Sequence, residues 1–148
     1  MAPREWVVDT CVLRISQDPH DPRSLDALAL LHLIKASDRL AVDHGRAIVK
    51  QYMKHVPPKS HAGQWLKSML SRADKVIFYP ACLCARHRSA LSALHFDPDD
   101  LVFVATASES VDKKLVSEDS DYSQTVMQYL EQNLGIHVLS IKESTQTT

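Results

Sequence analysis

Glycine, cysteine and long apolar runs are all scarce in this sequence. With only three glycines in 148 residues, the chain has no glycine-rich phosphate loop and no dinucleotide-binding fingerprint. No apolar run approaches the roughly 20 residues that a membrane span needs, so we expect no membrane partner. The formal net charge of -1 excludes a globally basic surface, and any nucleic-acid binding must therefore come from a local patch.

The three cysteines are Cys11, Cys82 and Cys84. They are too few for a disulfide-stapled scaffold and suit a reducing compartment. A zinc site is not indicated, because Cys82, Cys84 and His87 lack a second pair of ligands. The N-terminus also lacks the charged-then-apolar layout of a secretion signal. We therefore expect a cytoplasmic protein.

The composition is that of an ordinary globular protein, with 45% hydrophobic and 24% charged residues. The length is sufficient for one domain with a real core and too short for two. We expect this domain to cover residues 1–141, followed by a polar, frayed tail over 142–148.

Short apolar runs alternate with segments of helical periodicity along the chain. They predict strands at 6–8, 40–43, 75–79, 113–117 and 136–141, and helices at 22–38, 44–56, 62–73, 83–94, 101–107 and 122–133. Alternation of this kind requires right-handed crossovers between parallel strands. The predicted fold class is α/β, with a mainly parallel sheet of about five strands and helices on both faces.

Aspartates follow three of the predicted strands and precede one helix. Asp9 and Asp43 end the first two strands, Asp119 and Asp121 follow the fourth, and Asp100 precedes the helix at 101–107. The carboxyl ends of parallel strands share one edge of a sheet, so these side chains are expected to converge. Crowded carboxylates repel each other unless a cation holds them, and oxygen ligands favour Mg²⁺ or Mn²⁺. Taken singly, each aspartate is more commonly a helix cap or a turn residue.

Two groups of basic residues lie on predicted helices. Arg46, Lys50 and Lys54 fall four apart on the helix at 44–56, and Arg86 and Arg88 lie on the helix at 83–94. The usual explanation is a solvated surface. The alternative is contact with the phosphates of a nucleic acid, which positions its backbone without reading bases.

Three segments carry acidic residues in a characteristic order and spacing, namely 7–10 (VVDT), 99–107 (DDLVFVATA) and 115–121 (LVSEDSD). Through them the chain resembles the PIN-domain family of metal-dependent ribonucleases, which includes many toxin-type nucleases, and the match covers most of the chain. The resemblance implies a PIN-like three-layer α/β/α sandwich. It also implies a divalent-metal-dependent endoribonuclease that hydrolyses RNA phosphodiester bonds.

The resemblance assigns roles to individual residues. Asp9 is the central metal ligand, Asp100 a second and Asp119 a third, while Asp121 is an outer or alternative ligand. Thr10 and Ser117 match small hydroxyl residues that orient a carboxylate or a water. The implied cofactor is Mg²⁺ or Mn²⁺.

One position departs from the family pattern. The family places an acid, usually Glu, on the helix after the second strand, where this chain has Gln51. An amide oxygen can bind a metal or its water, but it carries no charge and cannot act as a base. Either Asp43 takes over part of the catalytic role or the site is weakened. Two hypotheses follow, an endoribonuclease and a PIN-like module that binds RNA or a protein without cutting.

The resemblance also implies partners besides the RNA substrate. A compact nuclease of this kind often works as a homodimer whose basic faces combine into one groove. In a toxin pair, a small antitoxin-like protein would cover the acidic pocket.

Overall fold

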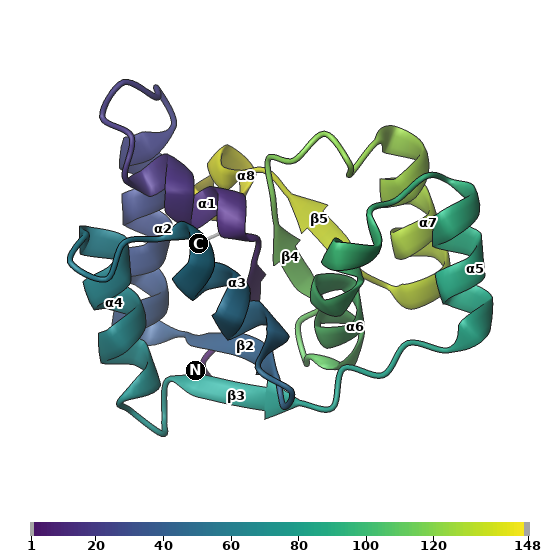
Figure 1. Cartoon of the computed structure of the whole chain (residues 1–148), viewed down its shortest axis with the longest axis horizontal. Coiled ribbons are helices and arrows are strands. Elements are labelled where there is room, and N and C mark those ends of the chain that lie inside the picture. The colour runs from purple at the N-terminus through teal and green to yellow at the C-terminus, as the bar shows by residue number, and fades with distance from the viewer. Residues whose placement is uncertain (1, 147–148) are drawn as a thin grey trace.

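The computed structural model describes residues 2–146, which form an α/β fold around a parallel sheet (Figure 1). The strands are β1 (Glu5–Val8), β2 (Arg39–Asp43), β3 (Val76–Tyr79), β4 (Lys114–Val116) and β5 (His137–Leu139). Their order is β3-β2-β1-β4-β5, and every neighbouring pair is parallel. The predicted mainly parallel, five-stranded sheet is confirmed.

Helices flank the sheet and complete a three-layer α/β/α sandwich. They are α1 (Thr10–Ser16), α2 (Ser24–Ser37), α3 (Ala47–His55), α4 (His61–Leu70), α5 (Ala85–Ala93), the 3-10 turn η1 (Pro98–Asp100), α6 (Leu101–Glu109), α7 (Gln124–Leu134) and α8 (Ile141–Gln146). In the view of Figure 1, α1 to α4 gather in the left half and α5 to α7 in the right half. Helix α6 packs on β1, β2 and β4, so it covers the three central strands of the sheet.

The central strand β1 is buried along its whole length. Trp6, Val7 and Val8 are fully inaccessible to solvent, as expected for a parallel strand covered on both faces. Val8 pairs with Val116 of β4, so β1 and β4 end at the same level. This register places the residues that follow the two strands side by side at the carboxyl edge of the sheet.

Local capping fixes several helix ends. The Ser123 hydroxyl accepts from the Val126 N–H at 3.3 Å and starts α7, and Gly135 ends that helix with a φ of 68°, a left-handed conformation that glycine adopts without strain. Ser60 caps α4 in the same manner by accepting from the Gly63 N–H at 3.1 Å. These caps bound the loop that leaves β4 and the loop that enters α4.

The expected frayed tail is wrong for residues 142–146, because they belong to helix α8. This helix packs against α2, with Ile141 and Ser144 fully buried. Residues 1, 147 and 148 of the expected domain and tail lie outside the described part of the chain. Among residues 2–146, no helix has the length and hydropathy to cross a membrane.

Candidate metal centre

The ends of β1 and β4 bring Asp9 and Ser117 together. The Asp9 N–H donates to the Val116 carbonyl at 2.9 Å, which extends the strand ladder by one bond. The Ser117 hydroxyl then donates to Oδ2 of Asp9 at 2.6 Å. Asp9 is only 4% exposed, so this hydrogen bond holds a buried carboxylate in one orientation.

The loop after β4 carries two further aspartates. Its first turn is ordered by the Asp119 N–H, which donates to the Ser117 hydroxyl at 3.0 Å. The Asp121 N–H donates to Oδ1 of Asp119 at 2.9 Å. This chain of local hydrogen bonds links Asp9 to Asp119 and Asp121 through Ser117.

The turn η1 and the residue before it supply further acids to the same cluster. Asp97 precedes Pro98 and caps the turn, accepting the Asp99 N–H on its side chain at 2.9 Å. Oxygen atoms of Asp97, Asp100 and Asp121 all lie within 4.8 Å of one another. The structure thus brings Asp100 and Asp121 together, as the sequence predicts. It adds Asp97, whose Asp-Pro pair at a helix start signals only a cap.

The electrostatics of the five aspartates show that they act on one another. Burial, and after it the negative charges of Asp9, Asp97, Asp119 and Asp121, together raise the pKa of Asp100 to about 7. The pKa of Asp9 is raised mainly by burial and also by Asp119, against the lowering effect of the Ser117 hydrogen bond. The pKa of Asp121 is raised by burial and then by Asp119 and Asp97. Removing this repulsion requires protons or a cation.

Cys11 lines the same region, but its surroundings disfavour the thiolate that a nucleophile requires. Burial and the nearby charge of Asp9 raise the pKa of its thiol to about 12. The Glu118 N–H donates to the Cys11 sulfur at 3.4 Å. A thiol that stays protonated cannot attack a phosphate.

Asp43 ends β2 as predicted, but its carboxylate caps helix α3. Oδ2 accepts from the Ala47 N–H and Oδ1 from the Ile48 N–H, each at 2.9 Å. Asp43 is 4% exposed. Helix capping accounts for its position, and a catalytic role for Asp43 stays a prediction.

Gln51 lies beside the acidic cluster and joins two of its elements. Its amide Nε2 donates to the Asp99 carbonyl at 2.9 Å, and its Oε1 receives a long hydrogen bond of 3.4 Å from the Thr10 hydroxyl. Gln51 therefore connects α3 to η1 and to the start of α1. The position where the family resemblance expects an acid thus lies near the site. In this chain it carries a neutral amide that links Thr10 to the Asp99 carbonyl.

The predicted basic residues all have exposed side chains: Arg46, Lys50 and Lys54 at α3, and Arg86 and Arg88 on α5. No ion pair found within residues 2–146 involves any of them. In the view of Figure 1, α3 and α5 lie on either side of α6, the helix that follows the acidic turn. Their charges are thus available to an anionic partner.

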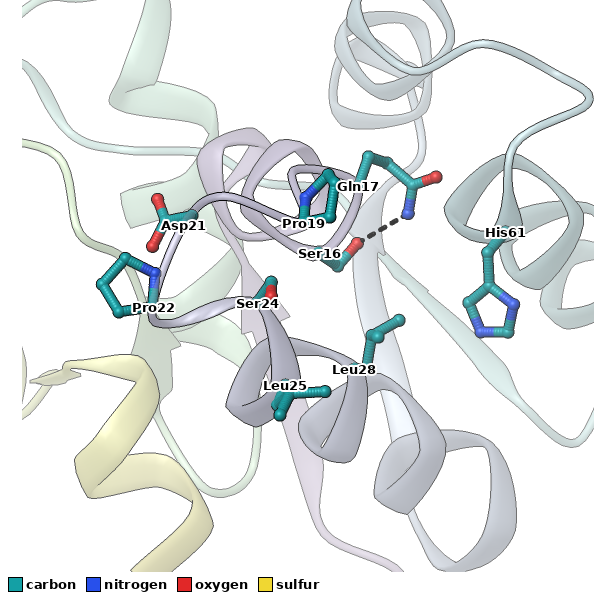
Figure 2. Close-up of a pocket in the computed structure, with 9 residues that line it drawn as sticks. All are labelled: Ser16, Gln17, Pro19, Asp21, Pro22, Ser24, Leu25, Leu28 and His61. Atoms are coloured by element: carbon teal, nitrogen blue, oxygen red, sulfur yellow. Dashed lines mark hydrogen bonds between the residues drawn. The ribbon is translucent and has the colours of Figure 1, made fainter.

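A sizeable open cavity lies elsewhere, between the end of α1 and the starts of α2 and α4 (Figure 2). Its volume is about 650 Å³, and Leu25, Leu28 and His61 are among its lining residues. None of the five clustered aspartates lines it. Burial, charge and the chemistry of the side chains, rather than cavity size, therefore identify the candidate site.

The donor set of the cluster fits a small divalent cation. Carboxylate oxygens are the preferred ligands of Mg²⁺ and Mn²⁺. Ligands on opposite sides of Mg²⁺ lie about 4.2 Å apart, since each bond is about 2.1 Å. Ligands at right angles lie only about 3.0 Å apart, so the Asp97, Asp100 and Asp121 oxygens, which lie within 4.8 Å of one another, would have to draw closer together to bind one ion. A comparison with protein-family models finds no match, and no curated protein is significantly similar to the chain.

Proposed function

We propose that this protein is a divalent-metal-dependent endoribonuclease that hydrolyses RNA phosphodiester bonds. The proposal is supported chiefly by one observation, the close approach of Asp97, Asp100 and Asp121, whose carboxylate oxygens lie within 4.8 Å of one another. Asp9 and Asp119 lie close enough for their charges to raise the pKa of Asp100. Carboxylates from three separate segments that repel one another are a costly arrangement unless protons or a cation reduce their charge, and a divalent cation does so for several of them at once.

The clustered aspartates and Ser117 would have different roles in such a site. Asp97, Asp100 and Asp121 would hold Mg²⁺ or Mn²⁺, and Asp9 would be the ligand oriented by Ser117. A bound divalent cation supplies charge stabilisation at a phosphate and activation of water. Asp119 orders the loop through its contact with the Asp121 N–H. Because the reacting water comes from solvent, the chain needs no side-chain nucleophile.

The exposed cations would position the RNA backbone. Arg46, Lys50 and Lys54 follow one face at α3, the helix whose Gln51 borders the cluster. Arg86 and Arg88 extend the positive charge on α5. Contacts with phosphates are independent of sequence, so we expect weak base preference and strong salt dependence.

The proposed setting of the enzyme follows the same reasoning. Cys11, Cys82 and Cys84 are free thiols, which suits the reducing cytoplasm. We propose a homodimer in which two basic faces form one RNA-binding groove. We also propose that an antitoxin-like protein would inhibit the enzyme by covering the acidic cluster.

The function is tested by incubating purified protein with mixed single-stranded and structured RNA in Mg²⁺, Mn²⁺ or EDTA. We expect endonucleolytic cleavage with either metal, none in EDTA, and a loss of at least a hundredfold in the Asp9→Asn variant. Asp26→Asn, an exposed change on α2, serves as the matched control and should cleave normally. Equal cleavage by Asp9→Asn and the parent would indicate a contaminating nuclease and contradict the proposal.

A second candidate function is favoured by Gln51. Its neutral amide bridges Thr10 and the Asp99 carbonyl at the position where an acid is expected, which suits a module that binds RNA or a protein without cutting. Such a module would bind RNA in the same assay, with no cleavage in any metal. Cleavage that depends on Asp9 would exclude it.

A further inference from the structure

The hydroxyl of Tyr122 is buried without a hydrogen-bond partner among the described residues. The other three tyrosines all have one. Tyr52 donates to the Val8 carbonyl, Tyr79 donates to Glu5, and the Tyr129 hydroxyl lies 2.7 Å from Nδ1 of His87. A buried polar group without a partner is rare in folded proteins and costs folding free energy. The exception at Tyr122 therefore needs a physical reason.

Packing explains the ring of Tyr122 but not its hydroxyl. The ring meets Phe96 edge to face, with 5.1 Å between the centroids. Phe96 directly precedes Asp97, and Tyr122 directly follows Asp121, so the two rings hold the two acidic segments together. A phenylalanine at position 122 would make the same contact. The hydroxyl is thus an extra group that the fold alone does not use.

The side chain of Tyr122 lies between the two acidic segments, and the charges of the acidic cluster act on its phenol. After burial itself, the charges of Asp9, Asp100 and Asp119 are among the causes that raise the pKa of Tyr122 well above its usual value. The backbone of Tyr122 belongs to the same acidic loop, because its N–H donates to the Asp119 carbonyl at 3.2 Å. The phenol therefore keeps its proton and is a neutral donor beside a group of acceptors.

We propose that the Tyr122 hydroxyl is a positioning donor of the acidic site, which holds the Asp9 carboxylate, directly or through one water, when a divalent cation is bound. The inference rests on the metal-dependent function proposed above. Cation binding requires the carboxylates to be ionised and drawn together, and ionised carboxylates accept more hydrogen bonds than protonated ones. A phenol supplies a donor without adding charge. Hydrogen bonds to ligating side chains typically change metal affinity by about 10- to 100-fold.

The test is Mn²⁺ titration of the full chain at pH 8 by calorimetry, together with thermal unfolding in EDTA. Tyr122→Phe keeps the ring contact with Phe96 and removes only the hydroxyl. We expect its Mn²⁺ dissociation constant to rise about tenfold, while its melting temperature in EDTA is unchanged or higher because an unpartnered hydroxyl has been removed. Tyr129→Phe, whose hydroxyl contacts His87 instead, is the matched control and should bind Mn²⁺ like the parent.

Each outcome bears on a different claim. Equal Mn²⁺ affinity in Tyr122→Phe and the parent would overturn this inference and leave the proposed function intact. A lower melting temperature of Tyr122→Phe in EDTA would also overturn it, because the hydroxyl would then stabilise the metal-free fold. No Mn²⁺ binding by the parent would reject the metal-dependent function itself, and this inference with it.

Discussion

Ser117 and Asp9, which are 108 positions apart in the sequence, are joined by a 2.6 Å hydrogen bond at the carboxyl edge of the sheet. The same Ser117 hydroxyl accepts the Asp119 N–H at 3.0 Å. One side chain thus fixes the buried carboxylate that follows β1 and the first turn of the loop after β4. The orientation of Asp9 and the path of that loop depend on each other.

Ser117→Ala tests this double role. The change leaves the Asp119 N–H without its acceptor and removes the bond that favours ionised Asp9, so we expect the free energy of unfolding to fall by about 1–3 kcal/mol. Metal-dependent cleavage should fall more than the folded fraction does. Urea denaturation and RNA cleavage measure the two effects.

The control for Ser117→Ala is Ser110→Ala. The buried Ser110 hydroxyl likewise donates one hydrogen bond and accepts another: it donates to the Ala107 carbonyl at 2.8 Å and accepts from the Lys113 N–H at 3.2 Å. It should lose similar stability and keep normal cleavage once folded. Parallel losses of cleavage in both variants would show that Ser117 acts on stability alone.

Because the pKa of Asp100 is raised, we expect the metal-free protein to become less stable as the pH rises. Its pKa is about 7 in the folded chain and near 3.8 when unfolded. Between these values the folded state holds a proton that the unfolded chain has released, so raising the pH lowers the free energy of unfolding. The contribution of Asp100 to the free energy of unfolding is complete below pH 4 and is lost as the pH rises through 7.

Asp100→Asn should remove this dependence. In EDTA at pH 8 we expect the variant to be about 1–2 kcal/mol more stable than the parent, which is less than the full pKa shift implies because the cluster borders solvent. At pH 4 the difference should vanish. Mn²⁺ should stabilise the parent at pH 8 and have little effect on the variant. A variant less stable than the parent at pH 8 would contradict this account.

Gln51→Glu restores an acid at the position where the family resemblance expects one. In EDTA at pH 8 it should lower stability by about 1–2 kcal/mol, because the donor to the Asp99 carbonyl is lost and a charge joins the acidic cluster. With Mn²⁺ the loss should shrink and cleavage should rise severalfold. Thermal unfolding with and without Mn²⁺ measures the first effect, and RNA cleavage the second.

Gln64→Glu is the control for this change. Gln64 also donates its amide to a backbone carbonyl, that of Lys59 at 3.3 Å, but it lies on the exposed surface of α4. Its stability should not respond to Mn²⁺. If Gln51→Glu is equally insensitive to Mn²⁺, position 51 does not belong to the metal site.

The sheet could be predicted because buried parallel strands are continuous apolar runs, as at Trp6, Val7 and Val8. Helix α8 could not, because its sequence is polar and shows no apolar periodicity. Its position depends on Ile141 and Ser144, one turn apart, both buried and joined by a 2.6 Å hydrogen bond from the Ser144 hydroxyl to the Ile141 carbonyl. Tertiary packing on α2 determines this helix rather than local propensity.

The candidate site was predictable to the extent that strand ends determine it. Asp9 and Asp119 converge because β1 and β4 are neighbours that end at the same level. Asp43 is the last residue of the neighbouring strand β2, yet its carboxylate accepts hydrogen bonds from the N–H groups of α3. Asp97 joins the cluster although its sequence signals only a cap. Strand order indicates which edge a carboxylate occupies, whereas the competing backbone donors decide where it points.

The stripe of Arg46, Lys50 and Lys54 should carry much of the RNA affinity. Replacing all three with Ala removes up to three phosphate contacts, each contributing about 0.7 to the slope of log affinity against log salt for single strands. We expect the slope to fall by about 2 and affinity at low salt to fall at least tenfold. Fluorescence anisotropy on the Asp9→Asn background measures binding without cleavage.

The control replaces Lys35, Lys67 and Lys142, three exposed lysines scattered over α2, α4 and α8, and it changes the net charge equally. If both triple variants lose affinity to the same extent, RNA responds to overall charge, and the stripe is an ordinary solvated helix face.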